Sequence, residues 1–213
     1  MNPHSDLTIH NNSATPQASD NENVDFRPQL RTDRLLLRPF QLDDAVQLER
    51  LINDRLIAFN TCSIDYPYLP GQGTEWIGPQ ADLWRQGKSA VFAICTLDAN
   101  ELMGAIGLEI NEIDQRAELG FWLGQGYRQQ GYCREAARAV VEYGLTTLAL
   151  NKIQAQYFRR NPASGKVLQK IGMQREGLLR RHRRKWGVFE DVIVCGMLAG
   201  DLANLGPGSG PSG

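Results

Sequence analysis

Histidine is scarce in this chain, and its scarcity removes several kinds of chemistry. Only three histidines occur among 213 residues, at positions 4, 10 and 182. A Ser-His-Asp or Cys-His catalytic group would have to use His182, and the sequence contains no G-x-S-x-G nucleophile elbow. The same count argues against a metal site built from several histidines. We expect no metal at the active site.

Paired cysteines, long apolar runs and a strong net charge are also missing. Cys62, Cys95, Cys133 and Cys195 are scattered without a C-x-x-C pair, which indicates neither a zinc site nor a disulfide framework. No apolar run reaches the roughly 18 residues of a membrane span, and no secretory signal is recognisable. A net charge of −1 provides no global basic footprint for nucleic acid. We expect a cytoplasmic protein without membrane attachment.

The two ends of the chain differ in composition from its centre. Residues 1–27 are polar and poor in large apolar side chains, which predicts a disordered tail. Residues 204–213 consist mostly of Gly, Pro and Ser, which predicts a second flexible tail. Residues 28–203 are enough for one domain with a complete core.

Strand and helix patterns alternate along that domain. We expect strands over residues 34–38, 90–95, 103–108, 116–123, 153–157 and 192–198. We expect helices over residues 42–52, 74–85 and 132–146 and a short one from 162 to Gly172, with Thr74 capping the second and residues 53–73 irregular. The order predicts an α+β fold with helices packed on a mixed sheet.

The most informative segment joins the strand over residues 116–123 to the helix over 132–146. Arg128-Gln129-Gln130-Gly131-Tyr132-Cys133 leads into that helix. The first turn of a helix has unpaired N–H groups, and its dipole places partial positive charge there. A strand, a loop and a helix start in this order predict an anion site, most often one for phosphate.

Two common phosphate-binding motifs fail on spacing. A dinucleotide fingerprint starting at Gly124 needs glycine at the position of Gln129. A P-loop ending in either Gly-Lys pair needs glycine where Asp82 or Arg160 stands.

What remains is an R-x-x-G-x-small loop after a strand that carries Glu118, and here the chain resembles the GCN5-related N-acetyltransferase (GNAT) superfamily. More narrowly, it is similar to the branch with the ribosomal-protein alanine N-acetyltransferases. Matching pieces occur in the family's order at residues 32–40, 117–123, 161–164 and 191–194. The resemblance implies a mostly antiparallel central sheet with helices on both faces, splayed strands and acetyl-CoA as acetyl donor.

The resemblance also implies which residues bind acetyl-CoA. Loop amides would hold the pyrophosphate, contributed by Gln129, Gln130, Gly131, Tyr132, Cys133 and Arg134, with Arg128 nearby. Phe121, Trp122 and Leu123 would offer backbone groups to the pantetheine arm, their side chains forming core or pocket wall, and Asn161 would contact CoA, cap a helix, or do both. Cys133 departs from the family's Gly or Ala. It is either a thiol whose pKa the helix start lowers or, as we favour, merely a small side chain.

Catalytic roles follow from the same resemblance. Glu118 would act as the base, through water; the alternatives are a glutamate that forms hydrogen bonds at a strand edge and one in a salt bridge with Arg116. The family's proton-donating tyrosine would stand at Leu168, so Ser164 is expected to protonate the thiolate instead. The alternative for Ser164 is a serine that satisfies a helix N–H.

The expected acceptor is a primary amine, foremost the α-amine of an N-terminal alanine or serine of a protein of the ribosomal type. An α-amine with a pKa of about 8 is roughly a tenth neutral at pH 7, whereas lysine is far less so. A small-molecule amine and a non-catalytic CoA-binding or ribosome-assembly module remain alternatives. The basic run at residues 180–185 predicts a solvated hairpin or a guide for an acidic partner or ribosomal RNA. Both a monomer and a dimer are compatible with the sequence.

Overall fold

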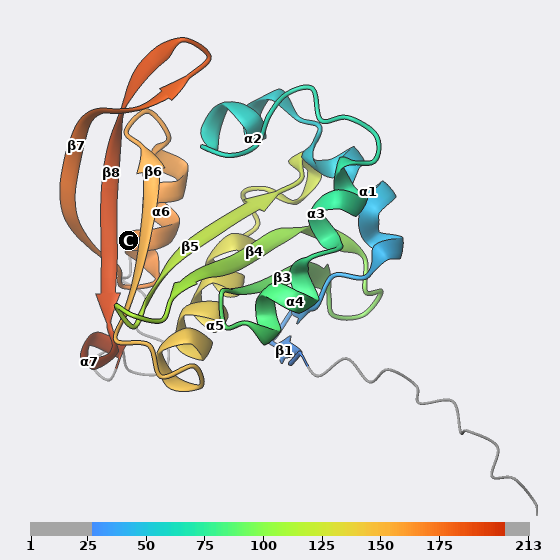
Figure 1. The fold of residues 1–213 in the computed structure, drawn as a ribbon, viewed down its shortest axis with the longest axis horizontal. Coiled ribbons are helices and arrows are strands. Elements are labelled where there is room, and N and C mark those ends of the chain that lie inside the picture. The colour runs from blue at the N-terminus through green and yellow to red at the C-terminus, as the bar shows by residue number, and fades with distance from the viewer. Residues whose placement is uncertain (1–26, 203–213) are drawn as a thin grey trace, which may run out of the picture.

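A computed structural model describes residues 27–202, and a single eight-stranded sheet organises them (Figure 1). Residues 1–26 and 203–213, where the two tails were expected, lie outside the described residues. The strands, in sheet order, are β1 (Leu30–Arg31), β2 (Leu35–Arg38), β3 (Ser89–Thr96), β4 (Leu102–Asn111), β5 (Arg116–Leu123), β6 (Lys152–Phe158), β8 (Val188–Leu198) and β7 (Gln174–Lys185). Only β5 and β6 pair in parallel, so the predicted mixed, mostly antiparallel sheet is confirmed.

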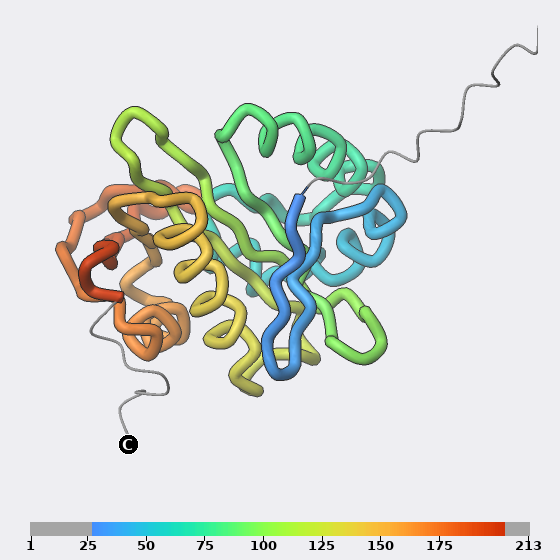
Figure 2. The backbone as a smooth tube through the Cα atoms, turned by 90° about the horizontal axis from the view of Figure 1, so that it is seen from below, coloured from blue at the N-terminus to red at the C-terminus, as the bar shows by residue number. Residues whose placement is uncertain are grey.

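Helices cover both faces of this sheet, as predicted. They are η1 (Leu42–Asp44), α1 (Ala45–Ile52), α2 (Arg55–Asn60), α3 (Gln72–Ile77), α4 (Gln80–Arg85), η2 (Gln125–Tyr127), α5 (Tyr132–Thr146), α6 (Pro162–Lys170) and α7 (Ala199–Leu202). The larger core lies between the sheet and α5, which crosses in front of the strands in Figure 2. A smaller core lies under α1 and α3. No helix within residues 27–202 is long and apolar enough to span a membrane.

The small residues of α5 let it approach the sheet closely. Ala136, Ala137 and Val140 are fully buried against it. A Cβ atom added to Gly144 would lie 2.6 Å from Cδ1 of Ile153 on β6. Because close packing leaves no room there, α5 is held against the sheet near its C-terminal end as well as at Ala136 and Ala137.

The sheet opens between β5 and β6. The two strands pair only from Arg116↔Lys152 to Glu118↔Gln154. Beyond this point β5 continues beside β4 as far as Leu123, and β6 continues beside β8 as far as Phe158. The strands diverge in Figure 1, and the backbone groups on the facing edges lack strand partners. The splayed strands implied by the resemblance are therefore present.

Three sequence predictions between residues 53 and 85 are wrong. The segment expected to be irregular contains α2, because Asp54 caps it by accepting a hydrogen bond from the Leu56 amide at 2.7 Å. The single helix expected over 74–85 is two helices, α3 and α4, separated at Gly78 and Pro79, since proline has no N–H to continue the helix ladder. The N-cap of α3 is Gly71, not Thr74.

The basic run forms the end of β7, next to the turn into β8. Residues 180–184 are exposed, as the solvated-hairpin prediction requires. Lys185 is buried, with its Nζ donating to the Ile64 carbonyl oxygen at 2.8 Å. Burial lowers the pKa of Lys185 below its ordinary value. The prediction is therefore wrong for this residue alone.

Candidate active site

Two clefts open on either side of the diverging strands. The first cleft, of about 790 Å³, lies between the end of β5, the loop after it and the start of α6. The second cleft, of about 580 Å³, lies on the side of the sheet that α1 and α3 cover. The residues that line both are Asn60, Thr61, Phe121, Trp122 and Ser164. Two ligands can therefore meet at this junction.

The loop before α5 presents its backbone to the first cleft. Gln129 and Gly131 adopt left-handed conformations, with φ values of 64° and 84°. These turns leave the amides of residues 129–134 without a backbone acceptor among residues 27–202. The loop residues that line the cleft are Gln129, Gly131, Tyr132, Cys133 and Arg134. Gln130 does not, because its side chain turns back to the Gly126 carbonyl oxygen at 2.9 Å.

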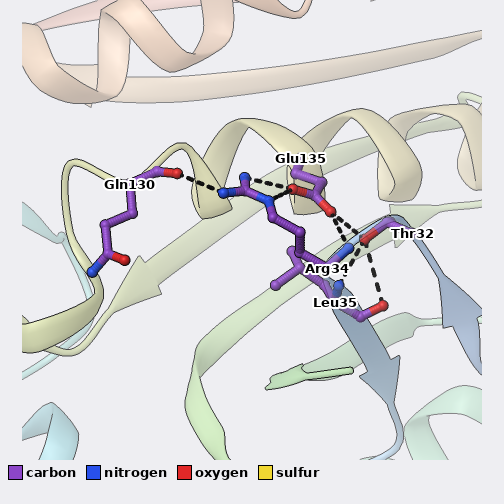
Figure 3. A network of polar contacts seen from close by, with 5 residues as sticks. All are labelled: Thr32, Arg34, Leu35, Gln130 and Glu135. Carbon is purple, nitrogen blue, oxygen red and sulfur yellow. Dashed lines mark hydrogen bonds and ion pairs between the residues drawn. The ribbon is translucent and has the colours of Figure 1, made fainter. Parts of the chain in front are cut away.

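A polar network behind this loop ties it to the start of β2 (Figure 3). Arg34 donates to the Gln130 carbonyl oxygen at 3.0 Å and to the Glu135 carboxylate at 2.7 Å. Glu135 also accepts from the Thr32 hydroxyl at 2.6 Å. The Arg34 guanidinium lies 4.6 Å from the ring centre of Tyr132. Sequence reasoning missed this function of Arg34, although it noted the segment at residues 32–40.

Arg128 lines the first cleft, but its side chain already has partners. Its Nη2 lies 2.5 Å from Oδ2 of Asp54, and its Nε donates to the Leu123 carbonyl oxygen at 3.0 Å. Burial acts to raise the pKa of Asp54, but hydrogen bonds from the Leu56 amide and from Arg128 outweigh it and lower that pKa. Arg128 thus fastens α2 to the end of β5.

Cys133 is packed among core side chains at the wall of the first cleft. Burial raises the pKa of its thiol to about 12, against a smaller opposite effect of Arg128. Desolvation therefore outweighs any lowering by the helix start. The interpretation of Cys133 as a thiol of lowered pKa is therefore wrong.

Asn161 and Ser164 form a hydrogen-bonded pair at the start of α6. Asn161 is the N-cap, with its Oδ1 accepting from the Ser164 amide, and Pro162 follows at the first helical position. The Asn161 Nδ2 donates to Ser164 Oγ at 2.9 Å. With an acceptor site of Oγ occupied, the Ser164 hydroxyl proton has no acceptor among the described residues and can be donated. The predicted cap is confirmed, and Asn161 also lines the first cleft.

Tyr157 is a phenol near α6 that sequence reasoning missed. A Cβ atom added to Gly165 would lie 2.5 Å from its hydroxyl oxygen, so Tyr157 packs beneath the helix next to Ser164. Burial raises the pKa of this phenol, which therefore keeps its proton. Leu168, at the family's tyrosine position, is buried in the core.

Glu118 lies on β5 in the second cleft, half-buried. Its Oε2 accepts from the Nε2 atoms of Gln154 and Gln156, at 3.3 and 3.4 Å. Arg116 instead lies 3.2 Å from Asp114, so the predicted salt bridge of Glu118 with Arg116 is wrong, whereas the hydrogen bonds from the two glutamines agree with the strand-edge alternative. The Oε1 atom of Glu118 has no partner among residues 27–202, and the Oε1 of Gln156 is buried without one. This corner of the cleft can accept hydrogen bonds from a donor that enters it.

Helix α2 and the β7–β8 hairpin close the outer end of the second cleft. Arg160, after β6, donates to the Phe59 carbonyl oxygen at 2.7 Å and to the Asn60 side chain at 3.0 Å. The rings of Phe59 and Trp186 lie 5.5 Å apart. Among residues 27–202, no group of three or more His, Cys, Asp and Glu side chains is placed to hold a metal ion.

Comparisons with known proteins agree with this geometry. A family model described as an acetyltransferase (GNAT) domain matches residues 34–174. An uncharacterised N-acetyltransferase, p20, of Bacillus licheniformis is 32% identical over 177 residues, which cover 82% of this chain and 98% of that protein. The [ribosomal protein uS5]-alanine N-acetyltransferase of Escherichia coli is 23% identical and covers 81% of this chain and 92% of its own. A solved ribosomal α-N-protein acetyltransferase in complex with coenzyme A has a TM-score of 0.75 at 18% identity, covering 80% of this chain and 98% of that one.

Proposed function

The chain belongs to the acetyltransferase (GNAT) family, and we propose that it transfers the acetyl group of acetyl-CoA to the α-amine of a protein N-terminus. The observation that carries the proposal is the meeting of two clefts at Ser164. One cleft has the free amides that a pyrophosphate needs. The other contains a carboxylate that can accept a proton from an amine. The relatives are named N-acetyltransferases, so we set the alternative of a non-catalytic module aside.

The first cleft is suited to coenzyme A. The first cleft is lined by amides at the left-handed turns of Gln129 and Gly131 and in the first turn of α5. These amides carry partial positive charge, which favours binding of an anion. Beyond Glu118, the edge of β5 that faces β6 has backbone groups without a strand partner at residues 119–122, which can pair with the amides of the pantetheine arm. When bound, acetyl-CoA supplies a thioester, whose carbonyl carbon an amine can attack.

Glu118 and Ser164 then have complementary tasks. As the amine nitrogen bonds to the carbonyl carbon, Glu118 takes a proton from nitrogen, directly or through water. As the carbon–sulfur bond breaks, the Ser164 hydroxyl donates a proton to the sulfur, and Ser164 is reprotonated from solvent. A modest base is enough for an α-amine, because about a tenth of it is already neutral at pH 7.

The acceptor that we propose is an N-terminal alanine or serine, on a ribosomal or other cytoplasmic protein. Support comes from the relative named for alanine acetylation of a ribosomal protein. A small-molecule amine is the competing acceptor. Release of free thiol from acetyl-CoA, measured with peptides that begin in Ala or Ser and with small amines, separates the two. Turnover of small amines with none of any peptide would overturn the proposal. Mass spectrometry of N-terminal acetylation in cells with and without the protein identifies the natural acceptor.

A further inference from the structure

We propose that the second cleft selects acceptors that carry a negative charge within a few residues of the amine, and that Arg183 binds this charge. The inference rests on the proposed function, because it describes the acceptor at the same site. It predicts an acidic peptide N-terminus as the preferred substrate class.

The first observation is that opposite charges face one another in this cleft without pairing. Glu118 lines it from β5 and Arg183 from β7, yet no ion pair joins them. Cys62 lines the cleft as well. Burial raises the pKa of the exposed Cys62 thiol most, Glu118 raises it further, and Arg183, Lys185 and Arg160 lower it, so charges of both signs act on this part of the cleft wall. An acceptor with an amine and an anionic group can satisfy both.

The second observation is that the carboxylates of the hairpin are already occupied. Glu190, across from Arg183 in the pairing of β7 with β8, binds the Nε of Arg160 at 2.8 Å. Asp191 accepts from the Arg181 amide at 2.9 Å and lies 3.3 Å from Arg159. The side chain of Arg183 has no hydrogen bond or ion pair with any described residue. Its charge is thus left for a partner, and guanidinium pairs well with carboxylate.

The third observation is the room between the two charges. The cleft of about 580 Å³ lies in the size range of small-ligand sites, about 300–1,000 Å³. Gly120, two residues after Glu118, keeps the floor open, since a Cβ atom added there would meet nothing within 4 Å. Tyr68, Trp76 and Trp122 provide apolar surface for small first side chains. The shape fits a short extended peptide segment, whereas a polyamine would bring like charge to Arg183.

A bulge in β7 determines which arginine faces the cleft. Pairing jumps from Leu179↔Val192 to Arg183↔Glu190, which inserts extra residues in β7. Side chains then alternate, so Arg183 and Arg184 point to opposite faces. Arg184 lies 5.9 Å from the ring centre of Phe189 and does not line the cleft. It provides a control with the same charge and nearly the same position.

The test compares peptides that begin with Ala and carry Asp, Asn or Lys within the next three residues. For the unmodified protein we expect kcat/KM to be about tenfold higher with Asp than with Asn, the effect of roughly one charge-assisted hydrogen bond. Arg183→Ala should abolish this preference through the KM for peptide, with the KM for acetyl-CoA unchanged. Arg183→Glu should reverse it in favour of Lys. Arg184→Ala should retain it, although the net charge changes equally.

The outcomes separate this inference from the proposed function. If peptides are acetylated without an acidic preference, or if Arg183→Ala and Arg184→Ala lose it equally, the inference is wrong and the proposed function stands. If no peptide reacts but a small amine that carries a carboxylate does, and Arg183→Ala raises its KM, the proposed function is wrong and the charge-binding role of Arg183 stands. Circular dichroism of each variant shows that the fold is kept.

Discussion

The Arg34 guanidinium binds Oε2 of Glu135 through two nitrogens, with Nε at 2.7 Å and Nη2 at 2.6 Å. This ion pair connects the residue directly before β2 to the first turn of α5. The remaining nitrogen of Arg34 reaches the carbonyl oxygen of Gln130, in the loop itself. The conformation of the loop before α5 therefore depends on a residue almost a hundred positions earlier in the chain.

Arg34→Ala should loosen the loop and weaken acetyl-CoA binding. We expect the KM for acetyl-CoA to rise about tenfold with little change in kcat, because the loop must be ordered at the time of binding. Arg31→Ala, which removes another exposed arginine nearby, is the matched control and should leave both constants unchanged. A fall in kcat at constant KM for acetyl-CoA would contradict the role of Arg34 in ordering the loop.

The Glu135 carboxylate should make the free energy of unfolding depend on pH in the acidic range. Burial acts to raise its pKa, but hydrogen bonds from Thr32 and Arg34 outweigh burial, so the pKa in the folded state lies below the unfolded value. Such a group stabilises the fold at neutral pH, and this contribution is lost as pH falls below about 4.3 through the folded-state pKa. Thermal unfolding of Glu135→Gln should show a lower Tm than the unmodified protein at pH 7, and a gap that narrows toward pH 3. An equal gap at both pH values would contradict the prediction.

Ser164→Ala should lower kcat with little effect on the KM for acetyl-CoA. Loss of the proton donor to the leaving sulfur should lower kcat about a hundredfold. Tyr157→Phe is the control, because this phenol packs under the same helix and can serve as the rival donor. If Tyr157→Phe loses more activity than Ser164→Ala, Tyr157 and not Ser164 is the proton donor. Equal loss of kcat and of acetyl-CoA affinity in Ser164→Ala would mean a structural role.

Glu118→Gln should lower kcat by about a hundredfold or more at pH 7, and the deficit should shrink as pH rises. Above the amine pKa of about 8 the acceptor is already neutral, so a base contributes less. Glu109→Gln provides the control, since Glu109 lies directly across from Glu118 on β4 and lines the same cleft. A deficit that stays constant up to pH 10 would argue that Glu118 only positions the acceptor.

Local patterns predicted much of this molecule correctly. The strand pattern over residues 116–123 identified β5, the helical pattern over 132–146 identified α5, and Asn161-Pro162 marked the start of α6. These features depend on side chains a few positions apart, whose effects are local. The failures have equally local causes. Helix α2 is only six residues long and relies on the Asp54 cap, and Pro79 divides what looked like one helix.

The sequence by itself determined the order of the elements, the loop with free amides at the start of α5 and the family resemblance, because each is encoded in contiguous residues. Only the tertiary structure decided which distant groups meet. It placed Ser164 at the junction of two clefts, held Glu118 between two glutamines and left the Arg183 side chain unpaired in the second cleft. It also settled the environment of Cys133, whose pKa burial raises although the helix start alone would lower it. These outcomes depend on desolvation and on contacts across the sheet, which no local pattern records.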